Sequence, residues 1–358
     1  MSRKVKSIVV EIVATAAVLV VLGVLSFDVD SDALVRLSSR PVGIMGTECK
    51  LTAVAPRDRA SPALERAEGA LRNVESLMSV YLEASELSKL NKAPAGRSIP
   101  LSPELMKVLS AAGKFNEQTD GAFDVTCYTL IRLWKRCGSE NRLPGEAELA
   151  EARKRVGMKH LQIAPDGVTK LAGGVMIDLG GIAKGYAIDR AIEAMKKAGA
   201  VGGVVDVGGD LRCFGVSGES KPWPVKIRHP FDKTRICATL SVTAAAVTTS
   251  GDYHRYFEIS GRRYSHIVDP RTGMALPAGH APSVTVISLP VGDVPPSAAA
   301  ADAWATAVSV LGAEGIELID AQPGLEAMII TGTPDQHEIR MSEGFKSLLS
   351  PGGQINLE

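Results

Sequence analysis

The amino-acid sequence predicts a single α+β domain that follows a membrane-spanning helix. Strand and helix patterns are mixed along the chain rather than alternating regularly, which favours α+β over a doubly wound parallel sheet. Several long segments carry apolar residues at helical spacing, and shorter segments bounded by turn residues have the character of strands. No internal repeat and no second linker interrupt residues 42–350, so we predict one domain there.

The first half of this domain is predicted to contain most of the helices. Residues 60–78 place Leu64, Leu71 and Val74 on one helical face, and residues 103–118 repeat the pattern. In order, we predict a strand at 42–54, helices at 60–78 and 103–118, a compact apolar segment at 122–134, a helix at 146–156, and short strands between 160 and 176 around an Asp166-Gly167 turn.

The second half mixes strands with helices. The helix at 185–198 is closed by Gly199, a residue type that commonly ends helices. The remaining predicted elements are strands at 201–207, 225–228, 238–242, 255–259 and 283–288, and helices at 297–311 and 313–319.

The N-terminus has the pattern of a membrane anchor. Residues 1–6 form a basic leader, and residues 7–27 are apolar except for Glu11, long enough to cross a bilayer. We predict an uncleaved single-pass helix, with a cleaved secretory signal as the alternative. Residues 28–41 would form a tether. Because basic flanks stay cytoplasmic, the domain is predicted to face outward.

Charge and composition limit the function classes. The chain has 40 Lys+Arg, 40 Asp+Glu and only 4% aromatic residues, which argues against nucleic-acid binding. The five cysteines include no C-x-x-C motif, which excludes zinc-finger and c-type haem sites. A Cys127–Cys137 disulfide is one reading, and buried small hydrophobic residues are the other.

The stretch at 176–189, MIDLGGIAKGYAID, is the strongest local signal. Asp178 precedes paired glycines, and Lys184 opens a predicted helix. Backbone amides at a helix start bind anions, and glycines let a phosphate approach closely. The alternative is ordinary turn chemistry, because the stretch is neither G-x-G-x-x-G nor a Walker A motif.

A second stretch, at 247–273, concentrates polar residues between short predicted strands. Its density of His, Asp, Arg and Ser suits an active-site loop. His266 is the better candidate for a general base, since imidazole titrates near neutral pH, and His254 is its rival.

The third stretch is the predicted helix that includes Asp302 and Thr306. These residues are four positions apart and share one helix face. A carboxylate and a hydroxyl there could hold Mg²⁺, with phosphate oxygens completing the coordination. Spacing alone favours a plain helix with two polar residues.

Seven stretches, in this order, closely resemble the FAD:protein FMN transferase family, also called the ApbE family. They are Met45-Gly46-Thr47, MSVYLEASELSKLN from Met78, GAFDVT from Gly121, MIDLGGIAKGYAID from Met176, VDVGGDLRCFG from Val205, SGDYHRYFEISGRRYSHIVDPRTG from Ser250, and ADAWATA from Ala301.

The resemblance implies a fold related to the tunnelling fold and an enzyme that uses FAD and Mg²⁺. Such enzymes transfer FMN from FAD to a Thr or Ser hydroxyl of an acceptor protein and release AMP. It also implies acceptor flavoprotein subunits of membrane redox complexes as partners. The catalytic domain would lie on the periplasmic side of the inner membrane.

The resemblance also implies roles for individual residues. His266 would be catalytic. The FAD contacts would be Met45, Tyr81, Ala122, Phe123, Asp124, Asp178 and Lys184. The metal ligands would be Asp302, Thr306 and the backbone carbonyl of Gly181.

The chain departs from the family pattern at two positions of the quoted stretches. Val125 stands where Pro is usual, and Ala305 replaces a further Asp found in some members, which puts a larger carboxylate shell in doubt. Two competing functions are an FAD pyrophosphatase, in which water attacks instead of a hydroxyl, and a membrane-tethered FAD carrier without catalysis. His266, Asp302 and Thr306 would serve no purpose in the carrier.

Overall fold

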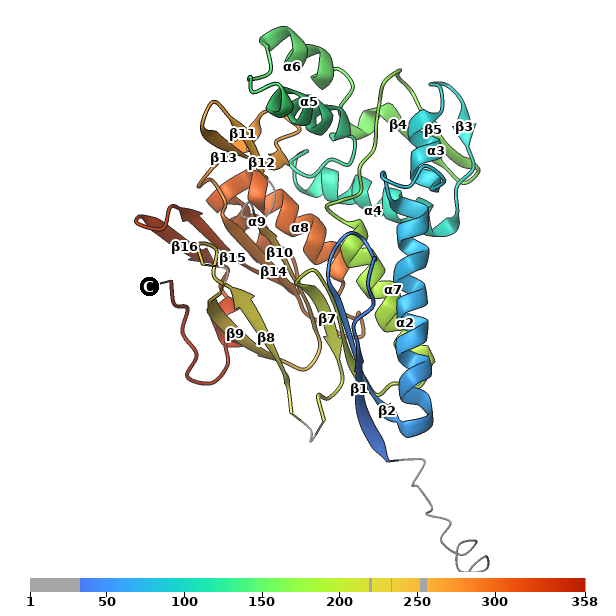
Figure 1. Ribbon diagram of the computed structural model, residues 1–358, viewed down its shortest axis with the longest axis vertical. Helices are drawn as coiled ribbons and strands as arrows, with labels where there is room; N and C mark the ends of the chain where they lie inside the picture. Colours follow the sequence, from blue (N-terminus) through green and yellow to red (C-terminus); the bar gives the residue numbers. More distant parts are fainter. Residues whose placement is uncertain (1–32, 219–220, 233, 252–255, 358) are drawn as a thin grey trace, which may run out of the picture.

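The computed structural model describes residues 33–218, 221–232, 234–251 and 256–357, and confirms the predicted mixture of helices and strands. An eight-stranded sheet, antiparallel throughout, forms the centre of the fold (Figure 1). Its strands, in spatial order, are β1 (Leu34–Ser39), β2 (Cys49–Pro56), β6 (Gly202–Val207), β7 (Asp210–Phe214), β10 (Ala245–Gly251), β14 (Ser283–Ser288), β15 (Leu325–Gly332) and β16 (His337–Met341).

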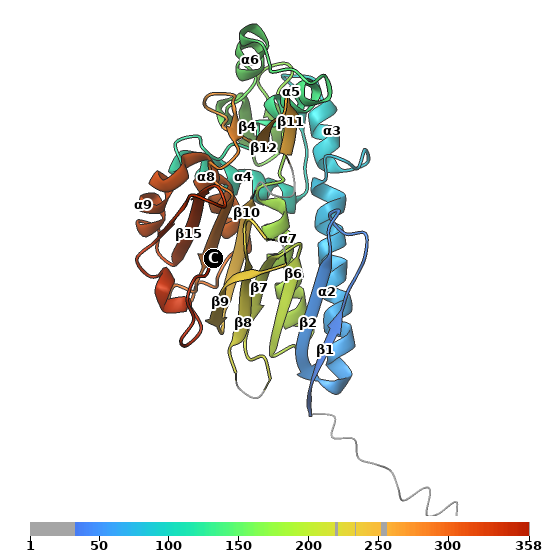
Figure 2. The same ribbon diagram turned by 60° about the vertical axis from the view of Figure 1, so that its left-hand side comes forward.

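Three helices cover one face of this sheet: α2 (Arg57–Met78), α7 (Ala183–Lys197) and α8 (Ala298–Leu311) (Figures 1 and 2). In α2, Leu64, Leu71 and Val74 recur at helical spacing and are all buried. The largest hydrophobic cluster lies between these helices and the sheet. Packing in this layer fixes the positions at which α7 and α8 begin, and the candidate site lies at these two helix starts.

The opposite face of the sheet carries a β-hairpin and the C-terminal segment. Strands β8 (Trp223–Arg228) and β9 (Ile236–Val242) pair with each other and bury alternate side chains against the sheet. The short helix η3 (Phe345–Leu348) packs beside them through buried Phe345. These parts form a second apolar cluster on the face away from the helices.

The remaining elements form a lobe at one end of the sheet, which we call the upper lobe (top of Figure 1). It contains α3 (Glu86–Lys92), α4 (Pro103–Gln118), α5 (Tyr128–Ser139), α6 (Glu146–Arg153), η1 (Met158–His160), β3 (Ser98–Ile99), β4 (Leu161–Ala164), β5 (Gly167–Lys170), β11 (Tyr256–Ile259), β12 (Arg262–Val268) and β13 (Ala275–Pro277). Helix η2 (Gly312–Glu314) and α9 (Gly315–Asp320) join α8 to β15.

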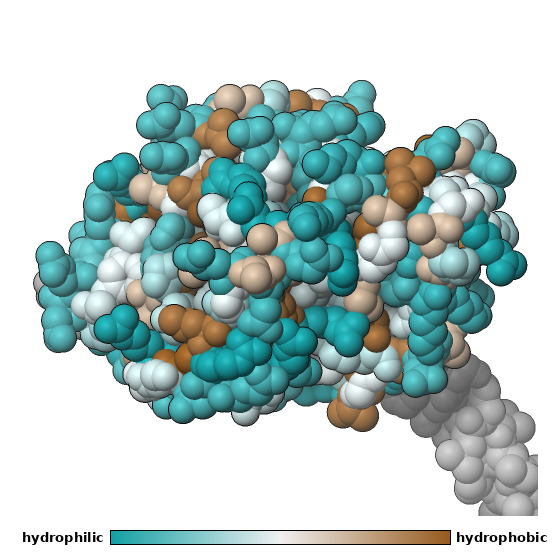
Figure 3. All heavy atoms as spheres, turned by 90° about the horizontal axis from the view of Figure 1, so that it is seen from above, coloured by the Kyte–Doolittle hydropathy of each residue, from teal (hydrophilic) through white to brown (hydrophobic). Residues whose placement is uncertain are grey.

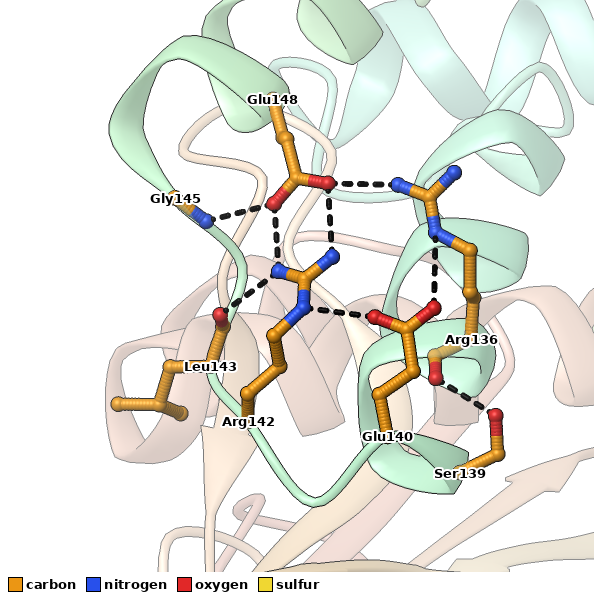
Figure 4. Close-up of polar contacts among 7 residues, drawn as sticks. All are labelled: Arg136, Ser139, Glu140, Arg142, Leu143, Gly145 and Glu148. Atoms are coloured by element: carbon orange, nitrogen blue, oxygen red, sulfur yellow. Dashed lines mark hydrogen bonds and ion pairs between the residues drawn. The ribbon is translucent and has the colours of Figure 1, made fainter.

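Ion pairs on the surface of the upper lobe join α5 to α6 (Figure 4). Glu148 of α6 accepts hydrogen bonds from Arg142 at 2.7 and 2.9 Å and from Arg136 at 2.7 Å. The Arg142 guanidinium is the main reason that the pKa of Glu148 falls to about 2. The side chains of these pairs are partly exposed to solvent, so each pair contributes little to stability.

The structure corrects the predicted tether and leaves the predicted membrane helix untested. Residues 34–39, expected in the tether at 28–41, form β1 and pair along β2 from Leu34↔Pro56 to Ser39↔Leu51. None of the helices in the described residues is long and apolar enough to cross a membrane. The predicted span at 7–27 lies outside those residues.

Several strands and helices differ from the sequence prediction. The stretch at 247–273, whose polar residues between short strands suggested an active-site loop, contains most of β10 and all of β12 in addition to β11, which confirms the strand predicted at 255–259. Residues 122–134, predicted only as an apolar segment, include the start of α5, and α3 lies between the helices predicted at 60–78 and 103–118, where no element was predicted. All five cysteines are free, so the disulfide reading is wrong.

Candidate active site

The predicted site residues gather at the end of the sheet where β6 ends and β7 begins. Gly208 and Gly209 make the turn between these strands with φ of 69° and 97°, a region that favours glycine. A Cβ on Gly208 would lie 2.6 Å from Thr47 Oγ1, so the loop before β2 packs directly on this turn. The stretches at 45–47 and 205–215 therefore meet here.

Lys184, in the first turn of α7, forms an ion pair with Asp210, the first residue of β7. Only 3% of Asp210 is exposed. Its second carboxylate oxygen, Oδ1, accepts the Thr249 N–H of β10 at 2.8 Å. Both oxygens of this buried carboxylate are thus engaged, as burial of a charged group requires.

Asp302 lies on α8, the helix that packs beside α7 and its Lys184–Asp210 ion pair. It is buried in α8, and its Oδ2 accepts the Gly185 N–H at 3.1 Å. Burial raises the pKa of Asp302 to about 6, the nearby Lys184 opposes this rise, and Asp210 adds to it. The three charged side chains therefore lie close enough to influence one another.

A close contact between α7 and α8 brings Lys184 and Asp302 together. A Cβ on Gly185 would lie 2.1 Å from the carbonyl oxygen of Ala298, a distance that no real Cβ tolerates. Glycine at this position lets the two helix backbones touch.

Gly181, Thr306 and Phe123 form an adjoining contact. A Cβ on Gly181 would lie 2.8 Å from Thr306 Oγ1 and 3.2 Å from Phe123 Cε2. Two of the residues predicted as metal ligands, Gly181 and Thr306, are therefore neighbours. A predicted FAD contact, Phe123, lies directly beside them.

Asp124 and Asp178 lie on two segments that run side by side. The Asp178 N–H donates to the Val125 carbonyl at 2.8 Å, and Asp178 Oδ1 accepts the Gly180 N–H at 2.6 Å. Asp124 Oδ1 accepts the Thr126 N–H at 2.7 Å and its hydroxyl at 2.6 Å. Burial raises the pKa of Asp124, while these hydrogen bonds oppose the rise. Ala122 is buried on the same segment.

Met45 and Tyr81 come from two loops at the same end of the domain. Met45 has a φ of 50°, and its N–H donates to Glu75 Oε1 at 2.7 Å. Tyr81 follows α2 and is 78% exposed. Burial is the main reason that the pKa of Tyr128 is raised, and the nearby Asp178 and Tyr81 add to the rise.

His266 lies within β12 of the upper lobe rather than on a loop, and it is half-buried. Strand β12 contacts α8, the helix that carries Asp302 and Thr306. The rival base candidate, His254, lies outside the described residues, as do Asp252 and Arg255 of the same stretch.

Sequence reasoning missed two buried acids that build this site, Asp210 and Asp189. Asp189 Oδ1 accepts hydrogen bonds from Arg212 at 2.6 Å and from the Ala298 N–H at 2.9 Å. Its Oδ2 accepts the Ala299 N–H at 3.1 Å. Asp189 therefore caps the start of α8 while it neutralises Arg212.

Both missed acids stand inside stretches that sequence analysis singled out. Asp189 ends MIDLGGIAKGYAID, and Asp210 follows the paired glycines of VDVGGDLRCFG. An acidic residue between apolar residues of a buried strand or helix was the available signal, because a buried charge needs a partner. The partners could not be named, since they lie 23 to 110 residues away.

The fold and the site define a class of protein: an α+β enzyme domain whose glycine turns, lysine and buried acids meet at one end of an antiparallel sheet. The ApbE family matches residues 45–329. The FAD:protein FMN transferase of Escherichia coli (strain K12) is 31% identical over 299 residues, covering 81% of this chain and 83% of that protein. The chain belongs to the ApbE family, and the resemblance seen in the sequence is confirmed.

Further relatives agree with this assignment. The FAD:protein FMN transferase of Vibrio cholerae (serotype O1) is 33% identical over 285 residues, covering 78% of this chain and 82% of that protein. The crystal structure of the ApbE protein from Thermotoga maritima matches with a TM-score of 0.77 and 32% identity, covering 89% of this chain and all of that one. The predicted enzyme class and family fold are therefore confirmed.

Proposed function

We propose that this protein transfers the FMN half of FAD to a threonine or serine hydroxyl of an acceptor protein and releases AMP, in a reaction that requires Mg²⁺. The observation that carries the proposal is the cluster of Lys184, Asp210 and Asp302 beside the Gly181–Thr306 contact. It combines a cation for phosphate with oxygen ligands for a metal. Family membership supplies the flavin substrate.

The residues of the cluster fit Mg²⁺. Asp302, Thr306 and the Gly181 carbonyl offer a carboxylate, a hydroxyl and a carbonyl, the hard oxygen donors that Mg²⁺ prefers. The described residues contain no group of three or more His, Cys, Asp or Glu side chains able to hold a metal. The proposed site therefore combines one carboxylate with a hydroxyl and a carbonyl oxygen. This set leaves coordination positions of the metal for phosphate oxygens. Bound Mg²⁺ would neutralise charge on the pyrophosphate.

The protein residues have distinct tasks in the proposed reaction. Lys184 places a positive charge toward the pyrophosphate, and Phe123 and Tyr81 supply aromatic surface for the rings of FAD. His266 takes the proton from the acceptor hydroxyl as its oxygen bonds to the FMN phosphorus. The bond from that phosphorus to the AMP oxygen breaks, and AMP leaves with the electron pair.

We further propose that the domain is anchored in the inner membrane and works on its periplasmic side, on flavoprotein subunits of membrane redox complexes. The basic leader and apolar run at 1–27 support the anchor. Viewed from the upper lobe, the surface is mostly hydrophilic, with small separate apolar patches (Figure 3). Such a surface suits transient contact with an acceptor.

The test of this function uses the purified protein, FAD, Mg²⁺ and a candidate acceptor domain. Intact-mass spectrometry of the acceptor should show one added FMN, with AMP released in equal amount. AMP and free FMN without a change in acceptor mass, repeated with a second acceptor, would favour the pyrophosphatase. No consumption of FAD with either acceptor would contradict both activities.

The metal assignment gives a prediction for Asp302→Asn. The amide keeps the size of the side chain and can still accept from Gly185 N–H, but it loses the charge that attracts Mg²⁺. We expect the Mg²⁺ concentration for half-maximal transfer to rise at least about tenfold. A Mg²⁺ titration of the transfer rate measures this, with Asp320→Asn of α9 as the control. An unchanged Mg²⁺ requirement would remove Asp302 from the metal site.

A further inference from the structure

We propose that Asn91 is a positioning residue for the loop at 178–181, which carries Asp178 and the Gly181 carbonyl, an inference that rests on the proposed function. Asn91 lies near the end of α3 in the upper lobe, 86 residues before Ile177 in the chain. It is the last residue of the stretch MSVYLEASELSKLN, of which the proposed function uses only Tyr81.

The side chain of Asn91 bonds to both backbone groups of Ile177, the residue that directly precedes the loop. Its Oδ1 accepts the Ile177 N–H at 2.7 Å, and its Nδ2 donates to the Ile177 carbonyl at 2.8 Å. Ile177 is fully buried and lies outside the strands of the sheets. One amide side chain thus supplies the donor and the acceptor that a neighbouring strand would otherwise supply to this buried backbone.

Asn91 is itself fixed in place by its surroundings. The Ser85 side chain caps the first turn of α3, and Leu87 and Leu90 are fully buried in the largest hydrophobic cluster. At the end of the helix, Lys170 of β5 is buried and its Nζ donates to the Asn91 carbonyl at 2.7 Å. The backbone of Ile177 is therefore held against a part of the upper lobe that has little freedom to move.

The loop after Ile177 leads directly to the proposed metal site. Asp178 Oδ1 accepts the Gly180 N–H at 2.6 Å, which folds the loop back on itself. A Cβ on the next residue, Gly181, would lie 2.8 Å from Thr306 Oγ1. Mg²⁺ requires a nearly octahedral set of oxygen ligands, so a carbonyl displaced by about 0.5 Å or more would bind it poorly. Holding Ile177 thus holds a proposed ligand in register with α8.

Asn91→Leu removes both hydrogen bonds and keeps the shape of the side chain. The Asp178 N–H still donates to the Val125 carbonyl at 2.8 Å, so the loop keeps one attachment. We expect a folded protein whose loop samples several positions, only a fraction of which suit the metal. The apparent dissociation constant of the metal should then rise by the inverse of that fraction.

The first experiment measures metal binding directly, on the full-length protein with FAD and Mn²⁺. Mn²⁺ takes the same oxygen ligands as Mg²⁺ and serves as its probe. By titration calorimetry, we expect the Mn²⁺ dissociation constant to be at least about tenfold higher for Asn91→Leu than for the natural protein. Thermal unfolding checks that the variant is folded. Asn91→Ala, which leaves room for water beside the Ile177 backbone, serves if it is not.

Hydrogen exchange tests the contact without metal, FAD or acceptor. Mass spectrometry of the peptide that covers residues 177–181 should show faster deuterium uptake in Asn91→Leu, because the Ile177 N–H has lost its acceptor. Uptake in β14, at the centre of the fold, should be the same in both proteins.

The transfer reaction separates positioning from damage to the fold. We expect the Mg²⁺ concentration for half-maximal transfer to rise at least about tenfold, while the rate at saturating Mg²⁺ stays within about threefold, because bound metal draws the loop into place. A variant with a damaged fold would lose rate at every Mg²⁺ concentration and keep the natural half-maximal concentration. That result would overturn the inference.

Asn73→Leu is the matched control. Asn73 is exposed on α2, and its Nδ2 donates to Glu104 Oε2 of α4 at 2.8 Å. The same substitution there also breaks a hydrogen bond between distant parts of the chain, but one that does not reach the loop. The Mn²⁺ dissociation constant should stay within about twofold of the natural value.

The outcomes distinguish this inference from the proposed function. An Mn²⁺ dissociation constant of Asn91→Leu within about threefold of the natural value, or no faster exchange at 177–181, would overturn the inference and leave the transferase activity standing. An equal loss of Mn²⁺ affinity in Asn73→Leu would do the same. A natural protein that binds no Mn²⁺ and transfers no FMN would contradict the proposed function, and the role of Asn91 would fall with it.

Discussion

Replacing His266 by alanine should lower the rate of FMN transfer by about 10²- to 10⁴-fold, the usual contribution of a general base. FAD affinity should stay within about threefold, because His266 belongs to β12 of the upper lobe, whereas Lys184, Asp210 and Asp302 lie on other elements. Rapid-mixing or intact-mass time courses measure the rate, and FAD titration measures the affinity.

The matched control is His280→Ala. His280 is half-buried and its ring contacts the Val310 carbonyl at 3.3 Å, so its loss should cost little activity. His254→Ala tests the rival base. Full transfer by His266→Ala together with loss of transfer by His254→Ala would assign the base to His254.

Replacing Asp189 by alanine should lower the free energy of unfolding by about 3–5 kcal/mol, the typical cost of removing one partner of a buried ion pair. Arg212 is only 4% exposed and would be left with an uncompensated charge. The Ala298 and Ala299 N–H groups at the start of α8 would lose their acceptor as well. Urea unfolding followed by circular dichroism measures the change.

Glu193→Ala is the control for this stability prediction. Glu193 lies on the same helix, α7, and pairs with Arg190 on the surface, with 44% of its side chain exposed. Its removal should cost no more than about 1 kcal/mol. A loss below about 1 kcal/mol for Asp189→Ala would show that the buried pair does not hold α7, β7 and α8 together.

The sequence predicted the bounds of an element closely where its apolar spacing and capping residues are regular. Helix α4 spans Pro103–Gln118 and β14 spans Ser283–Ser288, as predicted. Helix α4 begins with a Ser cap and Pro, and then shows regular apolar spacing. Strand β14 is an uninterrupted run of buried residues. In both, local propensity and tertiary packing favour the same structure.

The missed strands have local patterns that conceal their place in the sheet. β1 is an edge strand with mostly exposed residues, so it resembled a tether. β12 carries several exposed or half-buried polar side chains, His266 among them, and those residues suggested a loop. The ion pairs of Asp189 and Asp210 join residues that only the assembled sheet brings together, so no local pattern could predict them.

The contact between Gly185 and Ala298 has a consequence for motion. Because the backbones of α7 and α8 touch there, and Asp302 also accepts the Gly185 N–H, the two helices should move as one rigid body. Lys184 and Asp302 then keep their separation throughout a catalytic cycle. Any movement that opens the candidate site is therefore expected to come from the upper lobe, which carries β12, and not from a change in the spacing of α7 and α8.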